Sequence, residues 1–139
     1  LRAGDVPAVR LNGSTDILWE RYVDMAAHPD TTFYDYTKAP LRARRPAANY
    51  HLTASVDERP GSQARALEYL RAGYSAAVVV QTQDGQTVTT AKRAAAALID
   101  EGTWRGFPTI DAPGSWVVLF AKGTKAPRDR SGFVQRVAA

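Results

Sequence analysis

The stretch AVRLNGSTDILWERYVDMAAHPDTTFYDYTK, residues 8–38, decides the fold of this chain. Its first residues, 8–11, form a short run bounded by Pro7 and Gly13 and followed at once by polar side chains. That pattern is typical of a buried strand that ends in a loop. Residues 31–37 are rich in aromatic and β-branched side chains, and they predict a second strand.

The segment between these two strands has the spacing of an amphipathic helix. Leu18, Tyr22 and Met25 recur on one helical face, and His28 with Pro29 ends the pattern. We therefore expect a helix over residues 17–27. A strand, a loop, a helix and a second strand are the opening of a βα unit.

Polar residues gather where the two predicted strands end. Asn12, Ser14 and Asp16 follow the first strand, and Tyr36 and Lys38 close the second. Side chains beyond the carboxyl ends of parallel strands are free to meet a ligand, so these five would lie together if the strands are parallel neighbours. The alternative for Asp16 is structural, because an aspartate here commonly caps the helix that follows.

The rest of the chain continues the alternation of strands and helices. Residues 75–81 are a continuous apolar run, which is typical of a strand covered on both faces in a parallel sheet. Further strands are predicted at 49–56 and 116–121, helices at 61–72 (capped by Ser62) and 89–101, a loop with at most one helical turn at 39–48, and irregular structure at 104–114.

This alternation predicts an α/β fold with a mainly parallel sheet of about five strands, either an open sheet or a partial (β/α) barrel. We expect a single domain over residues 1–139. The basic tail, residues 122–139, either crosses the strand ends or hangs free. The chain begins with Leu1 and its only methionine is Met25, so we expect it to be part of a longer protein.

Composition limits the chemistry. The 139 residues include no cysteine and two histidines, which excludes thiol catalysis and leaves no obvious metal site. No apolar run is long enough to span a membrane and no secretory signal is evident, so we expect a cytoplasmic protein. His51, inside a predicted strand, is read as a structural histidine.

The net charge of +4 permits an acidic partner. Two basic clusters are candidates for nucleic-acid phosphates: Arg42, Arg44 and Arg45 in one, and Lys122, Lys125 and Arg128 in the other. A solvated basic face is the alternative for both.

Several segments resemble a family of uncharacterised bacteriophage and prophage proteins. They are RLNGSTDILWE (10–20), FYDYTK (33–38), NYHLTAS (49–55), the alanine and valine run at 76–80, and KGTKAPRDRSGFV (122–134). The resemblance covers nearly the whole chain and implies a phage protein that acts in an infected host cell. One departure is the segment before the last strand, residues 109–114, which is shorter than the acidic insertion of the family.

Members of that family are longer and carry a cysteine-containing segment upstream. Strands and helices that alternate after a cysteine cluster are similar to radical S-adenosylmethionine enzymes. The resemblance therefore implies that this chain is the carboxyl-terminal part, and that an iron–sulfur cluster and S-adenosylmethionine would bind only together with the upstream part, its expected partner. This step is fold-level analogy.

Three functional hypotheses follow. The first is part of a (β/α)-barrel-like enzyme that acts on a nucleotide or nucleic acid, with Asp16, Tyr36 and Lys38 as catalytic candidates; a DNA base transglycosylase is its narrower version. Substrate or cofactor would meet Asn12, Ser14, Thr53 and Ser55. The second is a non-catalytic nucleic-acid-binding or host-takeover module that uses the basic clusters. The third is a phage structural or assembly protein.

Overall fold

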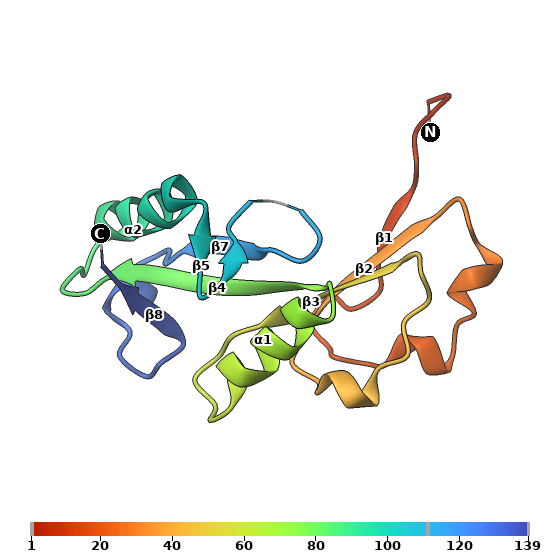
Figure 1. Ribbon diagram of the computed structural model, residues 1–139, viewed down its shortest axis with the longest axis horizontal. Coiled ribbons are helices and arrows are strands. Elements are labelled where there is room, and N and C mark those ends of the chain that lie inside the picture. Colours follow the sequence, from red (N-terminus) through yellow and green to blue (C-terminus); the bar gives the residue numbers. More distant parts are fainter. Residues whose placement is uncertain (1, 111, 139) are drawn as a thin grey trace.

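The fold is α/β and rests on a parallel, open sheet, as the sequence predicts (Figure 1). The computed structural model describes residues 2–110 and 112–138, so Leu1, Asp111 and Ala139 lie outside the account below. The six strands of the sheet are β1 (Ala8–Arg10), β2 (Thr32–Thr37), β3 (Tyr50–Ser55), β4 (Ser75–Thr82), β7 (Trp116–Phe120) and β8 (Val134–Val137). Every pairing between them is parallel, and within the described residues the sheet does not close into a barrel.

The spatial order β1-β2-β3-β4-β7 repeats the order along the chain. Right-handed crossovers then carry the connections from β1 to β7 over the same face of the sheet, whereas the return from β7 to β8 crosses the other face. The hydrophobic core lies on the face that the connections from β1 to β7 cross, where Leu52 of β3, Val78 of β4 and Trp116 of β7 pack in one buried cluster with Tyr69 and Leu98 of two helices. We call this side the helix face and the opposite side the open face.

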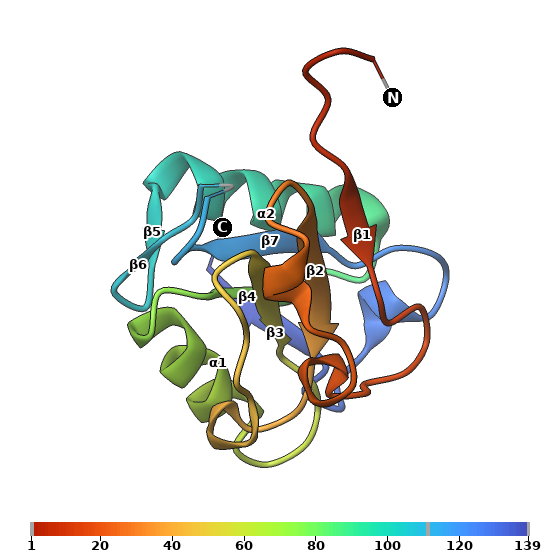
Figure 2. The same ribbon diagram turned by 90° about the vertical axis from the view of Figure 1, so that its right-hand side faces the viewer.

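Two α-helices and a hairpin cover the helix face. They are α1 (Ser62–Arg71), α2 (Val88–Glu101) and the antiparallel pair β5 (Thr103–Trp104) and β6 (Phe107–Pro108). Single 3-10 turns at Trp19–Arg21, Met25–Ala27 and Leu41–Ala43 pack beside them, and a fourth turn lies in the tail at Ala126–Arg128. In Figure 2, α1 and the hairpin lie on one side of the strands and the tail segment lies on the other.

Strand β4 has three neighbours, and this makes the sheet fork. Its Ser75–Ala77 segment pairs with β3 and its Val79–Thr82 segment pairs with β8, while residues 76–80 pair with β7. Residues 76–80, which pair with β7, overlap both of these segments, so β3 and β8 must share the other edge of β4. The end of β3 therefore diverges from β4, and β8 fills the edge beyond it.

Helix boundaries follow ordinary capping rules. The Thr87 hydroxyl accepts a hydrogen bond from the Thr90 N–H at the start of α2, and Gly102 ends that helix at φ 75°. The prediction that Ser62 caps α1 is wrong. Gly61, at φ 82°, is the N-cap, and the Ser62 hydroxyl donates to the Asp57 carbonyl instead.

The predicted helix over residues 17–27 is also wrong. Leu18 and Asp24 have extended ψ angles of 75° and 89°, so the segment contains only two separate 3-10 turns. The apolar residues of this segment do not share one buried face as they would in a helix, because Met25 is buried while Tyr22 is 75% exposed. Long-range hydrogen bonds to Asn12, described below, hold this segment in place of a helical ladder.

Three other segments differ from expectation. Strand β1 is an exposed edge rather than a buried strand. Residues 104–114, predicted to be irregular, contain part of the β5–β6 hairpin. The tail neither hangs free nor only crosses the strand ends, because it adds β8 to the sheet. None of the helices in residues 2–110 and 112–138 is long and apolar enough to cross a membrane.

Candidate functional site

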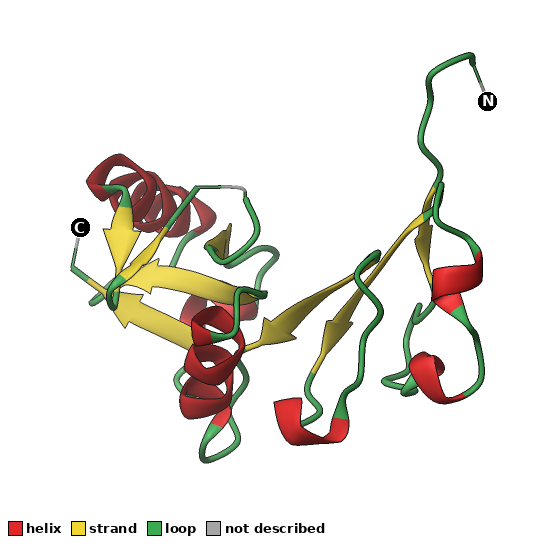
Figure 3. Cartoon of the chain, turned by 45° about the vertical axis from the view of Figure 1, so that its right-hand side comes forward, coloured by secondary structure: helices red, strands yellow, loops and turns green. Residues whose placement is uncertain are grey.

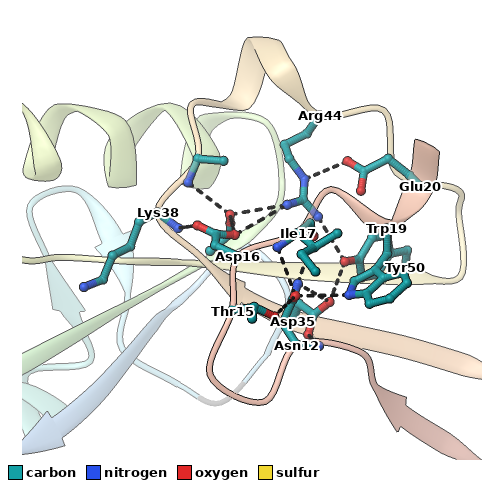
Figure 4. A network of polar contacts seen from close by, with 12 residues as sticks. Asn12, Thr15, Asp16, Ile17, Trp19, Glu20, Asp35, Lys38, Arg44 and Tyr50 are labelled. Atoms are coloured by element: carbon teal, nitrogen blue, oxygen red, sulfur yellow. Dashed lines mark hydrogen bonds and ion pairs between the residues drawn. The ribbon is translucent and has the colours of Figure 1, made fainter. Parts of the chain in front are cut away.

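Asn12, just beyond β1, is buried at the centre of a hydrogen-bond network (Figure 4). Its amide nitrogen donates to the Ile17 carbonyl at 3.0 Å and to the Asp35 carboxylate at 3.1 Å. Its side-chain oxygen accepts from the Thr15 hydroxyl, the Ile17 N–H and the Trp19 indole at 2.8 to 3.0 Å. Both ends of the amide are therefore used inside the protein.

Arg44 continues this network toward the carboxyl edge of the sheet. Its side chain is fully buried, its Nε lies 2.7 Å from Glu20, and it donates to the Tyr50 hydroxyl at 3.0 Å. Tyr50 in turn donates to Asp35 at 2.5 Å. Burial and this bond to Asp35 raise the pKa of Tyr50 above its ordinary value, so the phenol stays protonated.

Asp16 binds the end of β2. Its carboxylate accepts from the Thr37 hydroxyl at 2.7 Å and from the Lys38 N–H at 2.6 Å, and it lies 3.8 Å from Arg44. Strands β1 and β2 are parallel neighbours, as the predicted cluster of polar residues at their ends requires. The structure brings Asp16 to the backbone of Lys38, whereas Tyr36 is two residues earlier in β2 and faces the other way from Thr37.

The side chain of Lys38 reaches a second acidic centre. Its Nζ lies 3.6 Å from Asp57, which follows β3 and is buried. Arg59 donates to the same carboxylate at 2.7 Å and Arg65 lies 3.7 Å from it. Burial alone would raise the pKa of Asp57, but the bonds and charge of Arg59, followed by the charge of Arg65, lower it.

Asp57 lies on the wall of a cleft of about 600 Å³ at the fork of the sheet, which we call the fork cleft. One wall is the turn after β3 and the first turn of α1, and the other is the chain that leads into β8. The lining residues are Asp57, Glu58, Arg59, Gly61, Ser62, Gln63, Ala64, Arg130, Gly132, Val134, Gln135 and Arg136. Figure 3 shows the helix α1 and the strand β8 that border it.

The arginines on the tail side of the fork cleft make no close ion pair with the described residues, although the charges of Asp129 and Asp84 act on Arg136. Arg136 donates to the carbonyls of Thr82, Gly85, Pro127 and Asp129 at 2.5 to 3.2 Å. Within the described part of the chain, no carboxylate lies within 4.0 Å of the Arg136 or Arg130 guanidinium nitrogens. Burial, and then the charge of Arg130, lower the pKa of Arg136, as expected for crowded cations.

Tyr36 and Thr53 lie together on the open face. They are register partners in β2 and β3, and they line a hollow of about 390 Å³ with His51, Tyr74 and Ser75. The Arg10 guanidinium lies 5.3 Å from the centre of the Tyr36 ring. Ser55, two residues beyond Thr53, is half-buried on the same face.

The basic residues named by the sequence fall into two groups. Arg44 is buried, so it takes no part in a surface cluster. The remaining five are exposed, namely Arg42, Arg45, Lys122, Lys125 and Arg128. Ser14 is exposed as well. The roles assigned to all these residues stay predictions.

Sequence reasoning missed the fork cleft, although one signal was present. The segment Asp57-Glu58-Arg59-Pro60-Gly61 places two acids, a cation and a helix start directly after a strand. Arg130 and Arg136 could not be assigned to it, because their approach depends on the pairing of β8. Since the sequence has no cysteine, its residues do not fit a thiolate-bound iron–sulfur cluster. No group of three or more metal-ligating side chains occurs in residues 2–110 and 112–138.

Comparison with known proteins gives one match. Neither curated proteins nor solved structures include one that matches this chain. The sequence model of the family described as Gene product 88 matches residues 1–137, which is nearly the entire chain. This protein therefore belongs to the Gene product 88 family.

Proposed function

We propose that this protein binds a phosphate-bearing ligand, a nucleotide or a nucleic acid, in the fork cleft. The observation that carries the proposal is the meeting of Arg59 and Arg130 with the first turn of α1 on the cleft wall. Arg136 adds its charge there, while its guanidinium donates to backbone carbonyls. In open α/β sheets, ligands bind beyond the carboxyl ends of strands where neighbouring strands separate. The divergence of β3 from β4 is such a place.

The first turn of α1 adds to the attraction for an anion. The N–H groups of Gln63 and Ala64 have no intrahelical acceptor, and both residues line the cleft. Free N–H groups and the positive end of the helix dipole favour phosphate. The ten-residue length of α1 makes this a full helix terminus rather than a single turn.

Two carboxylates on the wall must be weighed against these cations. Asp57 is already compensated by Arg59, Arg65 and Lys38. Glu58 is exposed to solvent. The residues that line the cleft include three arginines and two carboxylates, so the lining has a net positive charge. Outside the lining, the charges of Asp129 and Asp84 act on Arg136.

The resemblance to phage proteins supports a nucleotide or nucleic acid as the ligand. An enzyme that acts on such a ligand is the second candidate function. What favours it is the sequential strand order with helices on one face, which is the arrangement of a partial (β/α) barrel with its site at the carboxyl edge. A transglycosylase-like reaction would need a free carboxylate. Asp16 is bound to the end of β2, so we put binding before that reaction.

The test is fluorescence anisotropy with labelled dT12, a single strand of twelve thymidylates, and with ATP as competitor. We expect binding whose logarithm falls linearly with the logarithm of salt concentration. The double variant Arg59→Ala/Arg130→Ala should weaken binding about tenfold, because two charged phosphate contacts are lost.

Arg71→Ala is the matched control, since Arg71 is an exposed arginine at the opposite end of α1. This variant loses one exposed charge outside the cleft, and it should change the affinity less than about twofold. The proposal is overturned if dT12 and ATP do not bind, or if the control weakens binding as much as the double variant.

A further inference from the structure

The open face of strands β1, β2 and β3 carries aromatic and basic side chains, and no element of residues 2–110 and 112–138 covers them. The helices α1 and α2 and the hairpin pack on the helix face. Tyr34 is 39% exposed, and its register partners are Arg10 on β1 and His51 on β3. Three planar or cationic groups therefore stand side by side across adjacent strands, about 4.8 Å apart in the backbone.

This row continues toward the fork cleft. Tyr36 lies two residues beyond Tyr34 on the same face, with Arg10 stacked against its ring. Lys38 follows two residues later and reaches Asp57 on the cleft wall. Lys38 thus links the open face to the wall of the fork cleft, where the arginines lie.

The charge of this face is of one sign. By alternation along β1, β2 and β3, the side chains on it are those of Ala8, Arg10, Thr32, Tyr34, Tyr36, His51, Thr53 and Ser55. None of these is a carboxylate, since Asp35 points to the helix face and is buried there. A polyanion on this face therefore meets no carboxylate among these side chains before it reaches Asp57 and Glu58 on the cleft wall.

We infer that the open face stacks the bases of a single-stranded nucleic acid whose phosphates enter the fork cleft, an inference that rests on the proposed function and narrows its ligand. Exposed aromatic rings beside a basic groove are the means by which proteins hold unpaired bases. The hollow beside Tyr36, lined also by Tyr74 and by the hydroxyls of Thr53 and Ser75, has the volume of a small ligand site. Paired bases do not present their faces to such rings.

The experiment compares dT12 with an abasic twelve-nucleotide strand, which keeps the phosphates and lacks the bases. The wild-type protein should bind dT12 at least about fivefold more tightly than the abasic strand. Tyr34→Leu should remove most of that preference and leave abasic binding unchanged, whereas Tyr34→Phe should keep it. Tyr22→Leu is the control, because Tyr22 is exposed in a loop of the helix face.

The outcomes separate this inference from the proposed function. If both strands bind in an Arg59-dependent and Arg130-dependent way but Tyr34→Leu has no effect, the stacking role is wrong and phosphate binding stands. If a twelve-base-pair duplex binds as tightly as dT12, the specificity for unpaired bases is wrong. If neither strand binds, both proposals fail. Circular dichroism of each variant confirms that it is folded before its affinity is compared.

Discussion

Arg44→Met is expected to lower the free energy of unfolding by about 3–5 kcal/mol. The substitution introduces an apolar side chain of similar length and removes the cation that is paired with Glu20, whose side chain is 5% exposed. It also removes the hydrogen bonds that Arg44 donates to the Tyr50 and Thr37 hydroxyls. A buried carboxylate without its partner accounts for most of the loss.

Urea denaturation followed by circular dichroism measures this effect. Arg45→Met is the matched control, because the neighbouring Arg45 is exposed and its change should stay within about 0.5 kcal/mol. Combining Arg44→Met with Glu20→Leu should recover part of the loss, since the stranded charge is removed. A loss below about 1 kcal/mol for Arg44→Met would show that the buried network contributes little.

Asn12→Ala is expected to cost about 2–3 kcal/mol of stability. The side chain makes five hydrogen bonds, and its loss leaves the Asp35 carboxylate with fewer donors in a buried place. The same change frees residues 15–19, so their amide hydrogens should exchange faster with solvent.

Ser14→Ala provides the comparison for Asn12→Ala. Ser14 is exposed two residues further along the same loop, and its substitution should be nearly neutral. Hydrogen exchange resolved by segment distinguishes a local effect from global unfolding. Equal protection of residues 15–19 in both variants would contradict the role assigned to Asn12.

Much of the fold could be predicted from local sequence patterns. Strands β2, β3, β4 and β7 show alternation or continuous apolar runs, and glycines or prolines mark their ends, so periodicity was sufficient for them. Helices α1 and α2 lie between β3, β4 and β7 and made their parallel pairing predictable, whereas only a loop with one 3-10 turn joins β2 to β3. Residues 17–27 misled the same reasoning, because apolar spacing also suits two short turns that insert Trp19 and Met25 into the core.

The candidate site was harder to predict, because it depends on partners distant in sequence. Asn12 and Asp16 were correctly expected at strand ends. Nothing local indicates that their polar groups are used by Asp35, 23 residues away, and by Thr37. Arg44 looks like its two arginine neighbours in sequence, and only the packing of Tyr50 and Glu20 makes it internal.

The tail side of the fork cleft was also hard to predict, because it too depends on partners distant in sequence. The sequence predicted a basic tail but not which of its arginines line the cleft, because the pairing of Val79–Thr82 with Val134–Val137 spans more than fifty residues along the chain. That pairing carries Arg136 to the cleft wall and sets Arg130 beside it. A register between distant strands is set by the whole sheet rather than by either segment.

The most direct test of phosphate binding at the fork cleft is a nitrogen-15 NMR titration of the protein with dT12 at low salt. If phosphates enter the fork cleft, the amide signals of Gly61, Ser62, Gln63 and Ala64 and the guanidinium signals of Arg59, Arg130 and Arg136 should shift together as the strand is added. Shifts confined to the exposed side of α2 or to residues 2–7, with the first turn of α1 unmoved, would contradict phosphate binding at the fork cleft.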